Sequence, residues 1–275
     1  MLKAWGFSLT GVLAVGLSLA FGQTISSLLR ETQWEQGKRY LAEGRTKEAK
    51  DAFESLLKNY PEEPDVHLFL GISSLRLRDV QAAKNHLKKV LKLSPSHVEA
   101  LTLLGWIKLE LEQDYTSAIG EYGKVVQLRP DSSEAQNNLG VALRKNGELD
   151  KSIESFNRAL ELNGDYSEAL SNRGWVYVQQ NKWREGRRDF ERALETNPND
   201  EGALYGLART LRGVRDYSGA QKALSKLISQ SPNFVYWLEW GQLYLVRYYW
   251  TLLLLAIALF AYSRYKKRRR PSNGG

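Results

Sequence analysis

Among residues suited to acid–base or metal chemistry, this 275-residue sequence has three histidines, no cysteine, and 31 aspartates and glutamates that are scattered along helix positions expected to face solvent. His67, His86 and His97 form no i,i+4 pair and no arrangement with carboxylates of the metal-site type, and we expect them on unrelated faces. The sequence has no glycine-rich phosphate loop, nucleophile elbow or dinucleotide fingerprint. We therefore expect no enzyme, no catalytic residue, no metal site and no cofactor. The lack of cysteine also excludes disulfides and thiolate zinc sites.

The positive charge of the chain lies at its ends. The net charge is +8, to which Lys3 contributes +1 and seven residues from Arg247 to Arg270 contribute +7, so residues 4–246 sum to zero. A body without net charge lacks the basic surface that binding to the phosphate backbone requires. We therefore expect no nucleic-acid partner.

Prolines and glycines recur along the body of the chain with a period of about 34 residues. The prolines are separated by 34, 35, 68 and 34 residues, and the glycines by 34, 34, 35 and 34. Both series place one extra residue in the third unit, between Gly105 and Ala118 and near the turn at 111–115. Two independent series that agree on one insertion indicate a true internal repeat of short amphipathic helices. The residues are Pro61, Pro95, Pro130, Pro198, Pro232, Gly37, Gly71, Gly105, Gly140 and Gly174.

The pattern within each unit resembles the tetratricopeptide repeat family. In the fourth unit the matching residues are the small Gly140 and Ser152, the aromatic Phe156, and Ala159 three residues later, while a closing proline ends most units. The resemblance covers residues 30–234 and implies an all-α fold, a right-handed α-solenoid of about six helix–turn–helix repeats. The implied units are residues 30–63, 64–97, 98–132, 133–166, 167–200 and 201–234.

By the same resemblance, the first helices of successive units line a concave groove that binds a protein or peptide partner. Tryptophan, asparagine and arginine side chains suit an extended peptide, and Asn138 and Asn172, at equivalent positions of neighbouring units, are candidates for holding its backbone. The alternative stays open that the aromatic residues are packing residues and that the polar ones are only solvated. The candidate groove residues are Trp34, Lys38, Ile72, Arg76, Trp106, Asn137, Asn138, Arg144, Asn172, Trp175, Tyr205 and Arg209.

The N-terminal segment, residues 1–22, begins with Lys3 and belongs to a run that then has no charge until Arg30. A short positive start, an apolar middle and the small-x-small sequence at residues 20–22 fit a secretory signal peptide. The uncharged run is also long enough to cross a bilayer as an uncleaved signal anchor. The two alternatives are both consistent with the sequence.

The C-terminal segment has the composition of a membrane anchor. We expect a capping helix at 235–242, a transmembrane helix at 243–263 in which Arg247 is the only charge, and a basic tail at 264–275. Tyrosine and tryptophan residues at 248–250 would form an interfacial belt. Five residues of the tail are candidates for contact with anionic lipid headgroups: Lys266, Lys267, Arg268, Arg269 and Arg270.

The flanking charges also predict an orientation. Basic residues remain on the cytoplasmic side, so the tail is expected there and the repeats in a periplasm or lumen, as for a protein of the bacterial inner membrane. The predicted function is a membrane-anchored scaffold that binds partner proteins or peptides in the assembly of an envelope complex. The alternative is a cytoplasm-facing docking receptor for chaperones or cargo proteins, which requires that residues 1–22 are no translocation signal.

Overall fold

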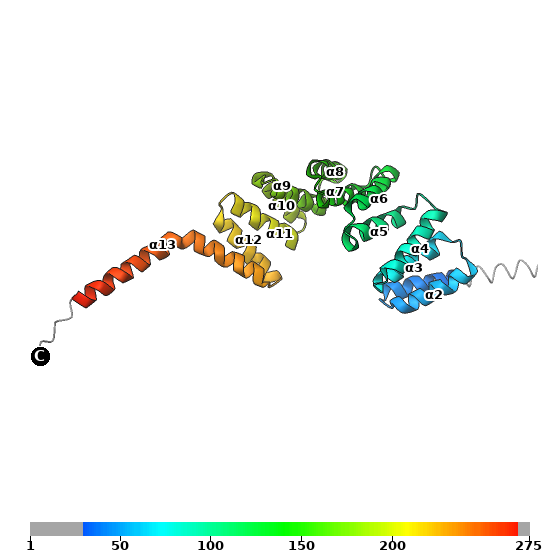
Figure 1. Ribbon diagram of the computed structural model, residues 1–275, viewed down its shortest axis with the longest axis horizontal. Helices are drawn as coiled ribbons and strands as arrows, with labels where there is room; N and C mark the ends of the chain where they lie inside the picture. Colours follow the sequence, from blue (N-terminus) through cyan, green and yellow to red (C-terminus); the bar gives the residue numbers. More distant parts are fainter. Residues whose placement is uncertain (1–29, 269–275) are drawn as a thin grey trace, which may run out of the picture. The chain divides into compact units, whose positions relative to one another are not determined.

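The computed structural model describes residues 30–268, and within this range the chain forms helices and turns without any strand (Figure 1). The predicted all-α class, built from helix–turn–helix repeats, is confirmed. The predicted signal or anchor at residues 1–22 lies outside the described residues, as do Arg269 and Arg270 and the side chains of residues 266–268. The chain divides into two compact units, and the boundary between them in the sequence lies between Leu128 and Arg129.

The first unit begins with a helix at residues 30–42, and consecutive helices form antiparallel pairs. Proline at the first position of α3 suits a helix start, because the missing N–H would have no partner there. Asp79 caps α4 by accepting a hydrogen bond from the Ala82 N–H at 2.9 Å. The helices are α2 (Thr46–Asn59), α3 (Pro64–Arg76), α4 (Val80–Leu93), α5 (Val98–Trp106), the π-helix η1 (Ile107–Leu111) and α6 (Tyr115–Leu128).

The second unit continues the same alternation and ends in a much longer helix. Ser132, Asp200 and Asp216 cap α7, α11 and α12 by accepting hydrogen bonds from backbone N–H groups three residues later. The helices are α7 (Ser133–Lys145), α8 (Leu149–Leu162), α9 (Ser167–Gln179), α10 (Trp183–Thr196), α11 (Glu201–Gly213), α12 (Tyr217–Gln230) and α13 (Phe234–Arg268).

Each turn inside a helix pair contains one residue in the left-handed conformation. These residues recur every 34 or 35 positions, in the sixth pair as well as the first five. Glycine adopts this conformation without strain and occupies it at Gly44 and Gly147, whereas the other four turns hold a longer residue there. The recurrence shows that the sixth pair keeps the register of the others. The remaining positions are Arg78, Gln113, Asn181 and Arg215.

The two helices of a pair cross where a small residue meets a large side chain. A methyl group added to Gly140 on α7 would lie 2.6 Å from the Phe156 ring of α8, and one added to Gly174 on α9 would lie 2.9 Å from Phe190. Both phenylalanine side chains are fully buried. The small residue is therefore required because the ring occupies the space of a side chain.

The extra residue of the third unit coincides with η1. A π-helix closes its hydrogen bonds over five residues instead of four, so a single π-turn accommodates one inserted residue within a continuing helix. The Glu112 N–H accordingly donates to the Ile107 carbonyl at 3.0 Å. The insertion lies at the end of the first helix of the pair, just before the turn at 111–115.

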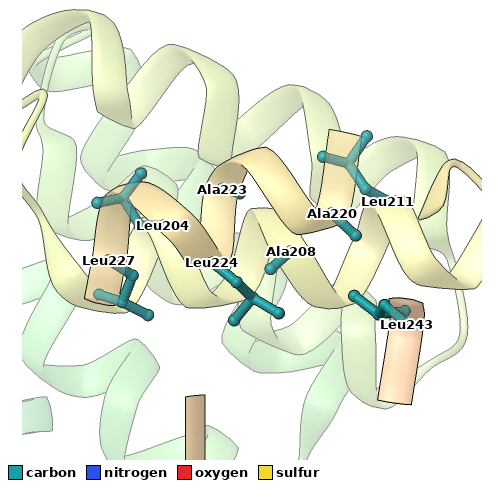
Figure 2. Packing of buried hydrophobic residues seen from close by; sticks show 8 residues of the cluster. All are labelled: Leu204, Ala208, Leu211, Ala220, Ala223, Leu224, Leu227 and Leu243. Carbon is teal, nitrogen blue, oxygen red and sulfur yellow. The ribbon is translucent and has the colours of Figure 1, made fainter. Parts of the chain in front are cut away.

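Helix α13 packs on α11 and α12 with its first turns and then continues alone (Figure 1). Leu243 is only 4% exposed and belongs to the core cluster drawn in Figure 2, so the first residue of the predicted span packs against the repeats. Arg247 Nη1 donates to Ser218 Oγ and Gln221 Oε1, both at 3.3 Å. By length and composition the segment Phe234–Tyr265 could cross a membrane, with a mean hydropathy of 1.8 in its most apolar window.

Two glycine substitutions test the crossing contact. Gly206 on α11 lies against the other side of the Phe190 ring, and an added methyl group would be 2.2 Å from it. We expect Gly206→Ala to lower the free energy of unfolding by about 1–3 kcal/mol through overpacking. Gly120→Ala should raise it by roughly 0.5–1 kcal/mol, because Gly120 has open space around it within α6. Urea unfolding of the full chain, followed by circular dichroism, measures the free energy of unfolding of each variant. Changes of the same sign for the two variants would contradict the close contact between Gly206 and Phe190.

The expectation that the histidines lie on unrelated faces is wrong for two of them. His67 on α3 and His86 on α4 stand at similar distances from the turn that joins these antiparallel helices, and their Nδ1 atoms are 3.2 Å apart. His67 Nε2 lies 3.0 Å from the Pro61 carbonyl oxygen, which can only accept. His67 therefore carries its hydrogen on Nε2, and His86 Nδ1–H donates to His67 Nδ1. The pair is thus satisfied with both rings neutral.

This pair predicts a pH dependence of stability. Burial lowers the pKa of His86 below its ordinary value of 6.5. A proton on the neighbouring His67 and the charge of Lys50 lower this pKa further, whereas Glu54 and Asp79 raise it. In the unfolded chain His86 is protonated below about pH 6.5, whereas in the folded chain it is protonated only at a lower pH. The free energy of unfolding therefore falls as the pH drops below about 6.5.

The control variant is His86→Asn, which keeps a side-chain N–H at the position of Nδ1 and cannot titrate. Urea unfolding at a series of pH values should show a smaller loss of stability between pH 6.5 and pH 5 for this variant than for the natural chain. Parallel curves for the two proteins would exclude His86 as the group responsible.

Candidate partner-binding site

The predicted groove residues lie on the first helices of the pairs. In the first unit these are the helix at 30–42, α3 and α5, and in the second unit α7, α9 and α11. Their surroundings differ, so each unit is described separately. The question for each side chain is whether it is already used inside the protein or remains open to a ligand.

Two of the predicted residues of the first unit are packing residues. Trp34 is half-buried, with its ring edge-on to Phe53 at 5.7 Å and to Phe69 at 5.2 Å between centroids. Ile72 is half-buried as well and packs against two core clusters of the unit. Both side chains therefore contribute mainly to the core. For Trp34 this agrees with the alternative, left open by the sequence, that the aromatic residues are packing residues.

The other three residues of the first unit lie nearer the surface. Lys38 forms an ion pair at 2.5 Å with Glu35, three residues earlier on the same helix, and Arg76 Nη1 donates to the Leu41 carbonyl at 2.5 Å. Arg76 thereby ties α3 to the end of the preceding first helix. Trp106 is 42% exposed, an unusual value for so large an apolar side chain within a packed helix pair. It is the predicted residue of this unit that is best placed to contact a ligand.

In the second unit the three asparagines have different roles. Asn172 Nδ2 on α9 donates to Asn137 Oδ1 on α7 at 3.0 Å, and Asn137 is only 6% exposed. Asn137 therefore serves as an internal link between first helices. Asn138 is half-buried, and its side chain has no hydrogen-bond partner among residues 30–268. The carbonyl oxygen of Asn172 is likewise available, so these two amides can bond a peptide main chain.

An aromatic row continues from Asn172 across the next first helices. The half-buried Trp175 ring packs edge-on against Phe190 at 5.5 Å, as Trp34 does against Phe53, and it also lies 6.0 Å from the ring of Tyr205 on α11. Tyr205 in turn lies 5.4 Å from Tyr236 on α13. The Tyr205 hydroxyl donates to Glu239 Oε1 at 2.6 Å. Burial, followed by this bond, raises the pKa of Tyr205. The row therefore keeps a neutral phenol, and its hydroxyl group is oriented by a carboxylate.

One of the two remaining predicted arginines, Arg209, lies beside this row. Arg209 is exposed and follows Tyr205 by one helical turn on α11, while Arg144 is half-buried near the end of α7. A guanidinium beside aromatic rings and amides can bind a carboxylate or a main-chain carbonyl of a ligand. The polar groups and the apolar rings thus lie on successive first helices, as recognition of an extended chain requires.

Sequence reasoning missed Tyr236 and Glu239, which belong to the same row. Residues 235–242 were expected only to cap the repeats. The period offered a signal, because Glu239 follows Tyr205 by 34 residues and so occupies the equivalent position of a seventh first helix. Helix α13 therefore completes the row of the second unit in addition to covering its core.

The described residues offer little for metal-dependent chemistry. Within residues 30–268 no group of three or more histidine, aspartate or glutamate side chains could hold a metal ion. The first unit has a pocket of about 300 Å³ between α4, η1 and α6. Four of its charged side chains form ion pairs, Lys84 with Glu112 and Lys108 with Glu121. The pocket thus resembles a solvated gap between helices more than a reaction site.

Solved structures share this architecture. The crystal structure of MamA is 26% identical, with a TM-score of 0.54 over 61% of this chain and 91% of that one. The pilF protein of Pseudomonas aeruginosa is 19% identical, with a TM-score of 0.68 over 78% and 96% of the two chains. YrrB, described as a TPR protein with an unusual peptide-binding site, is 20% identical, with a TM-score of 0.55 over 70% and 99%. The last two likenesses concern the fold alone.

Family models assign the repeats themselves. Models of the tetratricopeptide repeat match residues 35–83 and 70–125 in the first unit, and residues 131–199 and 177–239 in the second. The matches extend into α13, in line with the position of Glu239 as a seventh first-helix residue. Together they cover most of the described chain, and this protein belongs to the tetratricopeptide repeat family.

Proposed function

We propose that this protein is a membrane-anchored scaffold that binds an extended segment of a partner protein on the first helices of its repeats. Tetratricopeptide repeat domains bind protein or peptide partners, which supports the general class. The observation that carries the proposal is the row formed by Asn172, Trp175, Tyr205 and Tyr236 across α9, α11 and α13. YrrB, the related structure described as having a peptide-binding site, makes a peptide ligand a reasonable first choice.

The row has the chemistry that an extended peptide needs. Aromatic faces provide apolar contact area at little entropic cost, because each ring has few rotatable bonds and is held by its neighbours. Amide groups such as those of Asn138 and Asn172 can satisfy main-chain N–H and C=O groups that lose water on binding. In the first unit Trp106 offers the corresponding apolar contact. Each unit thus has at least one site for a side chain of the partner.

The anchor is the part of α13 beyond Arg247. All side chains from 249 to 265 are exposed, and most are apolar. The uncharged stretch from Tyr248 to Ser263 has 16 residues, which is about 24 Å of helix at about 1.5 Å per residue. A bilayer core is about 30 Å thick, and the long side chains of Arg247 and Arg264 can reach the surfaces at either end. We place the span there, later than the predicted 243–263.

The charges of the tail suggest the orientation. Lys266, Lys267, Arg268, Arg269 and Arg270 follow the span directly and favour the cytoplasmic surface, where anionic headgroups attract them. The repeats then lie on the periplasmic or lumenal side, where the scaffold would take part in assembling an envelope complex. The partner is accordingly a protein of that compartment.

Exposed residues of the first helices test the binding surface. Peptides selected by display against the full chain in nanodiscs should bind the variants Trp106→Ala or Arg209→Ala about 2 kcal/mol more weakly, roughly 30-fold in Kd. The matched controls are Leu128→Ala, which removes an apolar side chain 40% exposed at the end of a second helix, and Arg188→Ala on α10. Equal losses for variants and controls, or none for either, would rule out the first-helix surface.

A protease test addresses orientation. In spheroplasts of a bacterial host, added protease should digest the repeats and leave a protected fragment that contains an epitope placed after Gly275. The reason is that the basic tail holds its end of the span on the inner side. Intact repeats, digested only after lysis, would instead support the cytoplasm-facing docking receptor. A cytoplasmic marker protein that stays intact shows that the spheroplasts are sealed.

A further inference from the structure

Helix α13 carries an apolar face that nothing in the described chain covers. Trp237, Leu238 and Leu245 are 54%, 50% and 59% exposed. By the 34-residue period they correspond to residues of α11 that are buried in the second unit, because α10 and α12 pack against them. Within the described residues 30–268, no helix provides the same cover for α13. The buried equivalents are Ala203, Leu204 and Leu211.

Two of these residues, Leu238 and Leu245, belong to a regular line along the whole helix, which we name the seam. Its members alternate in steps of four and three residues, the heptad spacing that brings side chains to one side of a helix when it pairs with another. The line continues over four heptads, from the turns that pack on α12 into the proposed membrane span. The seam consists of Phe234, Leu238, Gly241, Leu245, Tyr248, Leu252, Leu255, Leu259 and Tyr262.

The seam is uncharged because the two charged residues of α13 before Arg264 point elsewhere. Glu239 accepts a hydrogen bond from Tyr205 on α11, and Arg247 donates to Ser218 and Gln221 on α12. These contacts orient the helix so that its charged side faces the repeats and the seam faces outward. Another helix could therefore pack along the seam without burying an unpaired charge.

Gly241 has no packing role among residues 30–268. A methyl group added to it would meet no atom within 4 Å, and glycine inside a helix is less stable than alanine. It lies in the middle of the extramembrane part of the seam, between Leu238 and Leu245. A small residue at such a position allows the backbone of a neighbouring helix to approach closely.

The geometry disfavours a helix of the repeat type as the occupant of the seam. In the described pairs the second helix packs on a small residue of the first, Gly174 in α9 and Ala208 in α11. The equivalent position in α13 holds Gln242. A helix in the repeat geometry would thus meet a long polar side chain. Such a helix is also about 14 residues long, too short to cover the seam.

We infer that two copies of this protein pair in parallel through the seams of their α13 helices, which rests on the membrane anchorage proposed above. Copies that insert into one membrane share one orientation, so their α13 helices run parallel and each seam residue faces its own counterpart. The identical, uncharged surfaces are self-complementary, as a twofold interface requires. The pairing does not involve the repeats, which contact Tyr236, Glu239 and Leu243 on another side of α13.

Cysteine cross-linking tests this pairing in the full chain, which has no natural cysteine. Single variants are reconstituted in liposomes and oxidised. Leu245→Cys and Leu259→Cys, on the seam, should form several-fold more disulfide-linked dimer than Val246→Cys and Ile257→Cys, which are similarly exposed on other faces. Equal yields at all four positions, or no dimer at any, would overturn the pairing. Flotation of the same liposomes tests anchorage separately, since a protein that floats without seam-specific dimers refutes only the pairing.

A second variant avoids the introduced thiols. Gly241→Leu fills the open space on the seam and should reduce the dimer fraction in nanodiscs several-fold, measured by single-molecule photobleaching. Gly120→Leu is the matched control, a helical glycine that also has no neighbour within 4 Å but lies on α6. An unchanged dimer fraction for Gly241→Leu, or a cross-link of Leu245→Cys in native membranes only to a different protein, would exclude a second copy as the occupant.

Discussion

The contact between a small residue of each first helix and a large side chain of its second helix is the constraint on which the structure depends. It sets how closely the helices approach at Gly105 and Tyr122, at Gly140 and Phe156, and at Gly174. Because the large side chain is buried between helices, it also reaches toward the next pair, as Phe190 does toward Gly206. The outward faces of the first helices are presented at a regular spacing as a consequence.

The fold could be predicted from the sequence because this constraint leaves visible traces, glycines at the crossings and prolines after the second helices. Features set by local geometry left no such trace. An inserted residue can be absorbed by a turn or by a π-helix, and only the structure shows η1 at Ile107–Leu111. The contact of His67 with His86 depends on how α3 and α4 meet across their turn, which periodicity does not specify.

The candidate site could be predicted only to the level of a helix face. The period assigns Trp34 and Trp106 to the same face, but one is packed between Phe53 and Phe69 while the other is open to solvent. Likewise, Asn137 and Asn138 are adjacent in sequence, yet the side chain of Asn137 already accepts a hydrogen bond from Asn172. Which side chain is consumed internally depends on its neighbours in the next pair, and the same residue types serve both purposes.

Helix α13 contributes to both the proposed partner binding and the proposed pairing because its faces make different contacts. One face carries Tyr236 and Glu239 to the aromatic row, a second buries Leu243 in the core, and a third carries the seam. All three faces belong to one continuous helix, from Phe234 to Arg268. In the proposed anchorage, a partner that binds Tyr205 and Tyr236 contacts the same helix that crosses the membrane. The seam lies on another face of that helix, so partner binding and the proposed pairing do not compete for the same side chains.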